Sequence, residues 1–224
     1  MLGNTDRGGT ELGAPFFLSY GRTRRGTHHT AAKYYPDQQV EEFFNDLTVD
    51  ISQLIVPPFH VPLGFMDRTM RSGMNWTREL LYALGTCQVL VALLSPKYLS
   101  SEWCGKEWHA FEQRDIHGLG QNTSPRQGCI IPVIWAPYPE NALPPQVGAD
   151  MIFSPDRAPD PKVPDLYQRM GIFGLKRTGL ADEYQMTVYE LALDIASVYY
   201  DQYLRFREFE PGDLRDVLGG GSGG

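Results

Sequence analysis

Cys87-Gln88-Val89-Leu90-Val91-Ala92-Leu93-Leu94 is the stretch of this 224-residue sequence that decides the fold class. Its last six residues are all apolar, which predicts a strand buried on both faces, as in a parallel sheet covered by helices on either side. Ser95-Pro96 follows directly, and because proline is tolerated in the first turn of a helix, this pair predicts a helix start. A buried strand that leads straight into a helix indicates an α/β fold.

Strand and helix patterns alternate along the rest of the chain. Apolar runs predict further strands at residues 15–20, 61–66, 129–135 and, as a short fifth strand, Met151-Ile152-Phe153. Apolar residues at helical spacing predict helices at residues 40–54, 76–84 and 184–198. Asn75 is placed to cap the second of these helices and Gly85 to end it. The alternation predicts a doubly wound, flavodoxin-like parallel sheet of five strands with helices on both faces.

The length of the chain suits one well-buried domain and is short for two. We assign residues 15–206 to that domain, residues 1–14 to a flexible N-terminus and residues 207–218 to a C-terminal extension. Residues 219–224 contain five glycines and one serine, and we interpret them as an appended linker.

The charge and hydropathy of the chain exclude several classes of function. A formal net charge of -7 disfavours a general nucleic-acid or anionic-membrane binder, although Arg22, Arg24 and Arg25 form a local basic patch. The longest apolar run, Val89 to Leu94, is too short to cross a bilayer, and Met1 to Gly13 does not resemble a signal peptide. We therefore expect a cytoplasmic protein without membrane or nucleic-acid partners.

The sequence lacks the common metal and nucleotide motifs. Cys87, Cys104 and Cys129 form no ligand pattern and lie in or beside apolar runs, so we expect them to be small core residues. His28 and His29 adjoin no other ligand cluster, and we expect no metal site. No GxGxxG follows the first predicted strand, GxxxxGK[ST] is missing, and no GxSxG forms an elbow between a predicted strand and helix.

The helix after the central strand carries the most informative residues. Ser100 or Ser101 can cap a helix that runs to Arg114. Trp103 and Glu107 lie one turn apart on it, on a face next to the one formed by Cys104, Trp108 and Phe111. This places an indole and a carboxylate near the carboxyl end of the strand, where such sheets bind ligands. On spacing alone, however, a surface glutamate and a groove-filling tryptophan explain the pair better than a site does.

Three segments resemble signature motifs of TIR domains. Phe16-Phe17-Leu18-Ser19-Tyr20 resembles the first signature box of the family. Residues 94–107, Leu-Ser-Pro-Lys-Tyr-Leu-Ser-Ser-Glu-Trp-Cys-Gly-Lys-Glu, resemble its third-helix motif, in which Ser, Tyr, Ser, Trp-Cys and Glu recur at this spacing. Ile131-Pro132-Val133 resembles its fourth strand, which accounts for a proline that would otherwise indicate an edge strand. The resemblance extends from Pro15 to about Tyr203.

A narrower likeness concerns the actinobacterial TIR-like group called FxsC, whose members accompany small peptide-modification systems. It rests on residues 64–68, Trp76, residues 104–108, and residues 171–176 followed by Tyr184. Similar TIR domains also occur as effector modules in antiphage systems, and the sequence does not separate the two contexts.

The resemblance to bacterial TIR domains that cleave NAD implies an enzyme that takes NAD as substrate and needs no cofactor. The family's catalytic glutamate corresponds to Glu107, and its substrate-facing aromatic residue to Trp103. Ser19 and Tyr20 would line the same cleft, together with residues at the second strand end: Phe65, Asp67 and Arg68. One carboxylate is sufficient, because nicotinamide leaves as a neutral molecule and the ribose becomes cation-like. Linear, cyclic and base-exchange products all remain open.

Residues 67–75 correspond to the family's BB loop, which gates the cleft and contacts a neighbouring domain. Asp67-Arg68-Thr69-Met70-Arg71-Ser72-Gly73 replaces the usual Arg-Asp-x-x-Pro-Gly, so its detailed contacts are expected to differ. A cleft completed by a second copy implies activity that depends on self-association, with a sensor domain or partner outside this sequence.

Two other readings stay open. A non-catalytic TIR–TIR interaction module would have the same fold, and the presence of Glu107 with Trp103 favours the enzyme over it. A phosphoryl-transfer receiver domain is less consistent, because it requires acidic residues where Ser19, Tyr20 and Ser95 stand.

Overall fold

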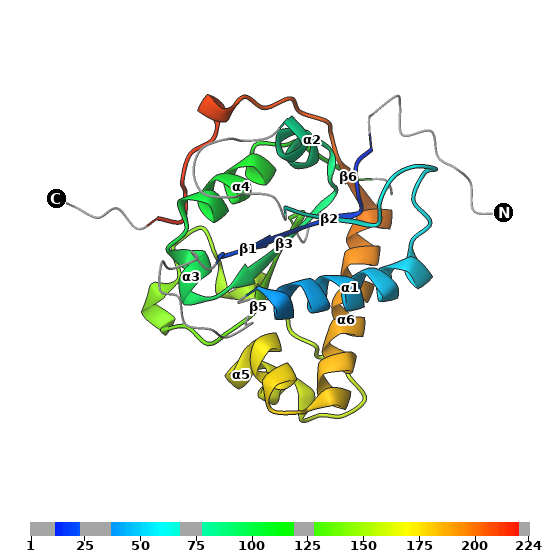
Figure 1. Cartoon of the computed structure of the whole chain (residues 1–224), viewed down its shortest axis with the longest axis vertical. Helices are drawn as coiled ribbons and strands as arrows, with labels where there is room; N and C mark the ends of the chain where they lie inside the picture. Colours follow the sequence, from blue (N-terminus) through cyan, green and yellow to red (C-terminus); the bar gives the residue numbers. More distant parts are fainter. Residues whose placement is uncertain (1–11, 23–36, 68–77, 119–127, 220–224) are drawn as a thin grey trace, which may run out of the picture.

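The computed structural model describes residues 12–22, 37–67, 78–118 and 128–219. Within them, a parallel sheet of four strands forms the centre of the molecule (Figure 1). Its order is β2 (Gly64–Met66), β1 (Phe16–Tyr20), β3 (Val89–Leu94) and β5 (Ile130–Ile134). From β1 the chain first adds β2 on one side and then β3 and β5 on the other. The position between β1 and β3 is therefore the switch point, where doubly wound sheets bind ligands. All six residues of β3 are buried, as its apolar run predicted.

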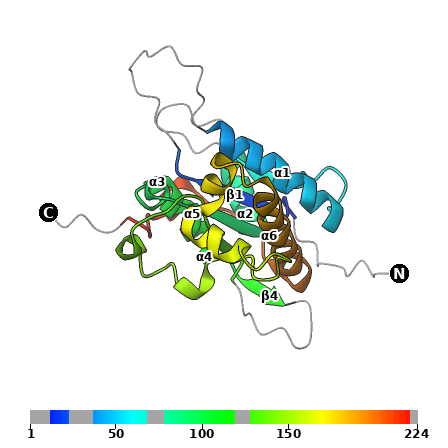
Figure 2. The same ribbon diagram turned by 90° about the horizontal axis from the view of Figure 1, so that it is seen from below.

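Helices cover both faces of this sheet. Figure 1 shows α2 (Arg78–Thr86) and α4 (Glu102–Glu112) on one side, and α1 (Gln38–Leu54), α5 (Val163–Arg177) and α6 (Ala181–Asp201) on the other. Figure 2 shows α1 lying alongside α6, and these two helices share many contacts. The one-turn helix α3 (Pro96–Leu99) lies at the carboxyl end of β3. No helix in the described part of the chain is long and apolar enough to cross a membrane.

The apolar stripes predicted from the sequence form the core. On α1 the buried residues repeat at helical spacing: Val40, Phe43, Phe44, Leu47 and Ile51. Cys87, Cys104 and Cys129 are free and buried, which confirms that they are core residues. The predicted doubly wound parallel architecture is therefore confirmed for the described residues.

The fifth strand predicted at Met151-Ile152-Phe153 is not formed. Residues 149–151 make a 3-10 turn, and only the Phe153 N–H reaches the sheet, donating to the carbonyl of Pro132 at 2.9 Å. In a parallel strand, alternate residues bond to the same neighbour. The next donor would be Pro155, which has no N–H, and the Met151 N–H is bonded within the turn. The segment touches the outer edge of β5 without extending the sheet.

Gly85 does not end α2 as predicted. It lies inside the helix, which continues to Thr86, and it is buried because the carbonyl of Arg207 fits against it where a side chain would stand. Asn75, the predicted cap, lies outside the described residues, as do Arg24, Arg25, His28 and His29.

Among the described strands and α-helices, two strands and one helix were not predicted from the sequence. The strands β4 (Ile116–Gly118) and β6 (Gln202–Leu204) pair antiparallel in a second, small sheet. The helix α5 forms after a proline-rich stretch, and Gly171 interrupts it with a φ of 64°. A Cβ on Gly171 would lie 2.6 Å from the carbonyl oxygen of Trp135, so glycine lets α5 approach the end of β5.

Residues 205–219 run across α2 and α4 (orange to red in Figure 1), and we call them the C-terminal strap. The Arg207 side chain donates to the carbonyl of Gln113 at 2.7 Å, and the Arg215 N–H to His109 Nδ1 at 3.4 Å. Three apolar side chains of the strap are buried: Phe209, Leu214 and Leu218. A Cβ on Gly105 would collide with the Asp216 carboxylate, so the strap lies directly on the helix that carries Glu107.

Candidate functional site

Three buried polar side chains meet at the carboxyl end of β1. The Ser19 hydroxyl donates to Oε2 of Glu107, and the Tyr98 hydroxyl lies 3.4 Å from Ser19 Oγ. The exposed fractions are 1% for Ser19, 0% for Tyr98 and 8% for Glu107. The three residues come from β1, α3 and α4, so the sheet and both helices are needed to assemble them.

Two serine caps orient the helices that carry Tyr98 and Glu107. Ser95 Oγ accepts the Tyr98 N–H at 3.2 Å and begins α3, with Pro96 in its first turn as predicted. Ser101 Oγ accepts the Cys104 N–H at 3.4 Å and begins α4. The two helices therefore start at positions set by local hydrogen bonds. The predicted helix is confirmed with Ser101 as its cap, and it ends at Glu112, just before Arg114.

Gly21 allows α3 to lie against the end of β1. A Cβ at this position would stand 2.5 Å from the carbonyl carbon of Lys97 and would also overlap the backbone nitrogen of Tyr98. Any side chain at residue 21 would push α3 away from the strand. The glycine after the first strand is therefore part of the geometry that holds Tyr98 beside Ser19.

An ion pair joins the ends of β1 and β2 next to this cluster. Arg22 lies 2.9 Å from Oδ2 of Asp67 and also donates to the Asp67 carbonyl. Asp67 is buried, with 6% of its surface exposed. The Arg22 guanidinium also lies over the ring of Tyr20, 5.5 Å from its centroid. Arg22 appears in the sequence prediction only as part of a basic patch, and this contact with Asp67 gives it a place at the site.

Burial is the main influence on the charge of Glu107. It raises the pKa of this carboxyl from 4.5 to about 7, because the ionised form loses hydration. The Ser19 hydrogen bond and the positive charge of Arg22 lower the pKa, and the negative charge of Asp67 raises it. Near neutral pH, Glu107 is therefore present in both protonation states.

Trp103 and Tyr20 lie on different sides of this cluster. Trp103 is partly exposed, one helical turn before Glu107 as predicted, with the Lys106 ammonium 5.2 Å from its ring centroid. Tyr20 follows Ser19 on β1 and so points to the opposite face of the sheet. Burial raises the pKa of Tyr20 to about 12, with Arg22, Asp37, Asp67 and Glu41 as its charged neighbours. The Ser19 side chain therefore faces α4, and the Tyr20 ring faces the first turn of α1.

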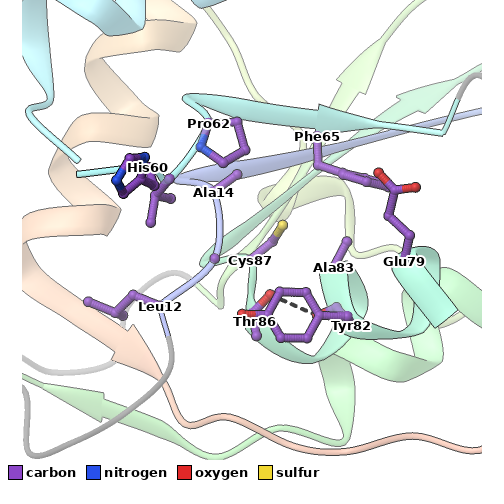
Figure 3. A pocket seen from close by; sticks show the side chains of 12 residues that line it. Leu12, Ala14, His60, Pro62, Phe65, Glu79, Tyr82, Ala83, Thr86 and Cys87 are labelled. Atoms are coloured by element: carbon purple, nitrogen blue, oxygen red, sulfur yellow. Dashed lines mark hydrogen bonds between the residues drawn. The ribbon is translucent and has the colours of Figure 1, made fainter. Parts of the chain in front are cut away.

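The contacts described for Phe65 do not include Glu107. Its ring stacks on Phe17, with centroids 5.3 Å apart, and lines a pocket of about 280 Å³ (Figure 3). Ala14 and Cys87, which precede β1 and β3, line the same pocket, so it opens at the amino ends of the strands. The pocket is therefore at the opposite edge of the sheet from Glu107. Arg68 lies outside the described residues.

Within the ranges that the structure describes, no three His, Cys, Asp or Glu residues are grouped so as to hold a metal ion. The chemistry available at the carboxyl edge is that of one buried carboxyl, two hydroxyls and an arginine–aspartate pair.

This arrangement is that of a doubly wound α/β domain with a buried acid at its switch point. Residues 60–158 match the family model described as TIR domain (TIR_2), so this part of the chain is similar to TIR domains. The matched residues include Asp67, Trp103 and Glu107, whereas Ser19 on β1 precedes them. No curated protein and no solved structure matches the chain. The resemblance to TIR domains is confirmed for these residues, and the narrower likeness to the FxsC group stays a prediction.

Proposed function

We propose that this protein is an NAD-cleaving TIR domain that releases nicotinamide, with Glu107 as the essential carboxylate. It would act as a signalling or antiphage defence effector in the cytoplasm. The observation that carries the proposal is the burial of Glu107 at the carboxyl edge of the sheet, with a neutral hydroxyl as its hydrogen-bond partner. A carboxyl whose pKa is raised to about 7 at a ligand-binding edge is typical of functional sites.

The chemistry requires one anionic group. When the bond between ribose C1′ and the nicotinamide nitrogen breaks, its electron pair moves to the pyridinium nitrogen, and nicotinamide leaves as a neutral base. Positive charge develops on the ribose, and the Glu107 carboxylate would stabilise it at a site where little water screens the charge. Water then adds to C1′ and releases a proton to solvent to yield ADP-ribose, or a nitrogen of the adenine adds and the adenine loses a proton to yield a cyclic product.

The other site residues have roles that follow from their positions. Trp103 is partly exposed one turn from Glu107 and could offer its face to a flat ring. Asp67 is paired with Arg22 in the free protein, so a role in binding substrate hydroxyls would require that pair to open. Ser19 would hold the carboxylate in place. Tyr20, Phe65 and Arg68 stay predicted substrate contacts.

Limited access to Glu107 supports a requirement for self-association. With 8% of its surface exposed, the carboxyl offers a bound ribose little room in the free protein. A second copy, or a sensor domain that brings copies together, would have to rearrange the residues around it. The alternative is a non-catalytic TIR–TIR interaction module, in which the buried Glu107 would have a structural role.

Nicotinamide release separates these two functions. Concentrated protein with a crowding agent is incubated with NAD, and the wild type is compared with Glu107→Gln and Glu112→Gln. The first variant keeps the size of the side chain and its hydrogen bond to Ser19 while removing the charge. The second makes the same change at an exposed position of the same helix. We expect Glu107→Gln to lose at least about 100-fold in turnover and Glu112→Gln to retain it. Assembled wild-type protein that releases no nicotinamide would favour the interaction module.

A further inference from the structure

The hydrogen-bond chain at the site has a direction that follows from its donors. Ser19 carries one hydroxyl hydrogen, and a carboxylate can only accept. When Glu107 is ionised, the Ser19 hydrogen points to it, and the contact of 3.4 Å between Ser19 and Tyr98 must then be donated by the Tyr98 hydroxyl. The chain therefore runs from Tyr98 to Ser19 to Glu107, and the first hydroxyl controls the orientation of the second.

A count of hydrogens shows which state of Glu107 this chain favours. With Glu107 ionised, two hydrogens fill the two contacts of the chain. With Glu107 protonated, three hydrogens share those two contacts, so one of them must find an acceptor outside the chain. A buried donor without an acceptor is costly, and Tyr98 is 0% exposed. The chain therefore opposes the effect of burial and stabilises the ionised carboxylate.

We propose that Tyr98 is a positioning residue of the NAD-cleaving site, acting through the Ser19 hydroxyl to hold Glu107 ionised and in one orientation. This inference rests on the proposed function for its role in catalysis. The contact between Tyr98 and Ser19 can be tested without any turnover.

The fold keeps Tyr98 in place without help from substrate. The Ser95 cap fixes the residue at the end of α3, and Gly21 lets that helix lie against β1. Three other ionisable groups act on the cluster from the surrounding segments: Arg22 after β1, Asp67 after β2 and Cys104 on α4. Replacing Tyr98 by phenylalanine leaves these three residues in place. A change in the titration of Glu107 would therefore report on the hydrogen bonds that link Tyr98, Ser19 and Glu107.

The test uses Tyr98→Phe, which removes the hydroxyl and keeps the buried ring. The matched control is Tyr167→Phe. Tyr167 is also 0% exposed, and its hydroxyl accepts the Ile134 N–H at 2.7 Å. This hydrogen bond is separate from the contacts of Ser19 with Tyr98 and Glu107. The pKa of Glu107 is obtained from the pH dependence of unfolding, as the difference between each protein and the same protein carrying Glu107→Gln. The pH profile of nicotinamide release is measured beside it.

We expect Tyr98→Phe to raise the pKa of Glu107 by about one unit and to move the acid limb of the activity profile to higher pH by the same amount. Tyr167→Phe should lower stability and leave the pKa unchanged. In a Ser19→Ala background, Tyr98→Phe should have no further effect on the pKa, because the link between them is gone.

Two results would overturn the inference. One is a shift for Tyr98→Phe no larger than that for Tyr167→Phe, and the other is a shift that persists in the Ser19→Ala background. If the expected shift appears while assembled wild-type protein releases no nicotinamide, the link from Tyr98 to Glu107 is supported and the proposed function fails.

Discussion

The hydroxyl of Ser19 on β1 donates a hydrogen bond to the carboxylate of Glu107 on α4, across 88 positions of sequence. This bond joins two of the three segments that resemble TIR signature motifs, although only Glu107 lies within the matched residues 60–158. Both groups are buried, so the bond forms where it strongly affects the charge of Glu107. The protonation state of Glu107 is therefore the property to test first.

The first prediction concerns the pH dependence of NAD cleavage. Only ionised Glu107 can stabilise positive charge on the ribose, and its pKa is raised to about 7. We expect kcat/KM for nicotinamide release to be half-maximal near pH 7 and to fall about tenfold per pH unit below it. Stopped assays across pH 5 to about pH 9 would measure this. A profile that is flat from pH 5 upward would contradict it.

The second prediction concerns stability. The pKa of Glu107 is higher in the folded chain, at about 7, than its ordinary value of 4.5, so the folded state binds more protons between these pH values. Stability therefore falls as pH rises through this window, and above it the buried charge costs up to roughly 3 kcal/mol.

Glu107→Gln removes this cost, and its advantage over the wild type should grow from near zero below pH 4.5 to its full size above pH 7. Urea unfolding at several pH values measures the difference, with Glu112→Gln as the control for a neutral amide on the same helix. An advantage that does not depend on pH would show that burial does not raise the pKa.

A third prediction separates the two charges beside the site. Arg22 lowers the pKa of Glu107 and Asp67 raises it. Arg22→Gln should therefore raise that pKa, and Asp67→Asn should lower it. Each change also removes the compensation between Arg22 and Asp67, which reinforces the same direction. The pH-dependent unfolding difference against Glu107→Gln measures both. Shifts of the same sign would show that loss of the ion pair itself, rather than the charges, controls the site.

The C-terminal strap provides the fourth prediction. Gly105→Ala places a Cβ against the Asp216 carboxylate, and we expect it to destabilise the fold by about 1–3 kcal/mol through overpacking. Gly212→Ala is the control, because a Cβ there meets nothing within 4 Å. Asp216→Gly should reduce the effect of Gly105→Ala in a double-mutant cycle. Equal effects of Gly105→Ala in both backgrounds would mean that the strap does not contact α4 in solution.

Much of the fold could be predicted from local patterns. An uninterrupted apolar run identifies β3, helical spacing identifies α1 and α6, and the Ser101 cap identifies the start of α4. The predictions failed where contacts between residues distant in sequence determine the local structure. The antiparallel pair β4 and β6 joins residues far apart in sequence, and neither strand carries a strong pattern of its own. Gly85 fits the pattern of a helix end, but it is required for contact with Arg207.

The features of the candidate site also divide into those predictable from local sequence and those that depend on tertiary contacts. The sequence by itself determined that Trp103 and Glu107 lie one turn apart on a helix that follows a buried strand, because helical periodicity and capping act over a few residues. Only the tertiary structure decided that Glu107 is buried against Ser19 and Tyr98 and that Arg22 pairs with Asp67. These contacts join separate elements of the sheet and helices. The charge of Glu107 depends on the water that those elements exclude, and that exclusion exists only once they pack together.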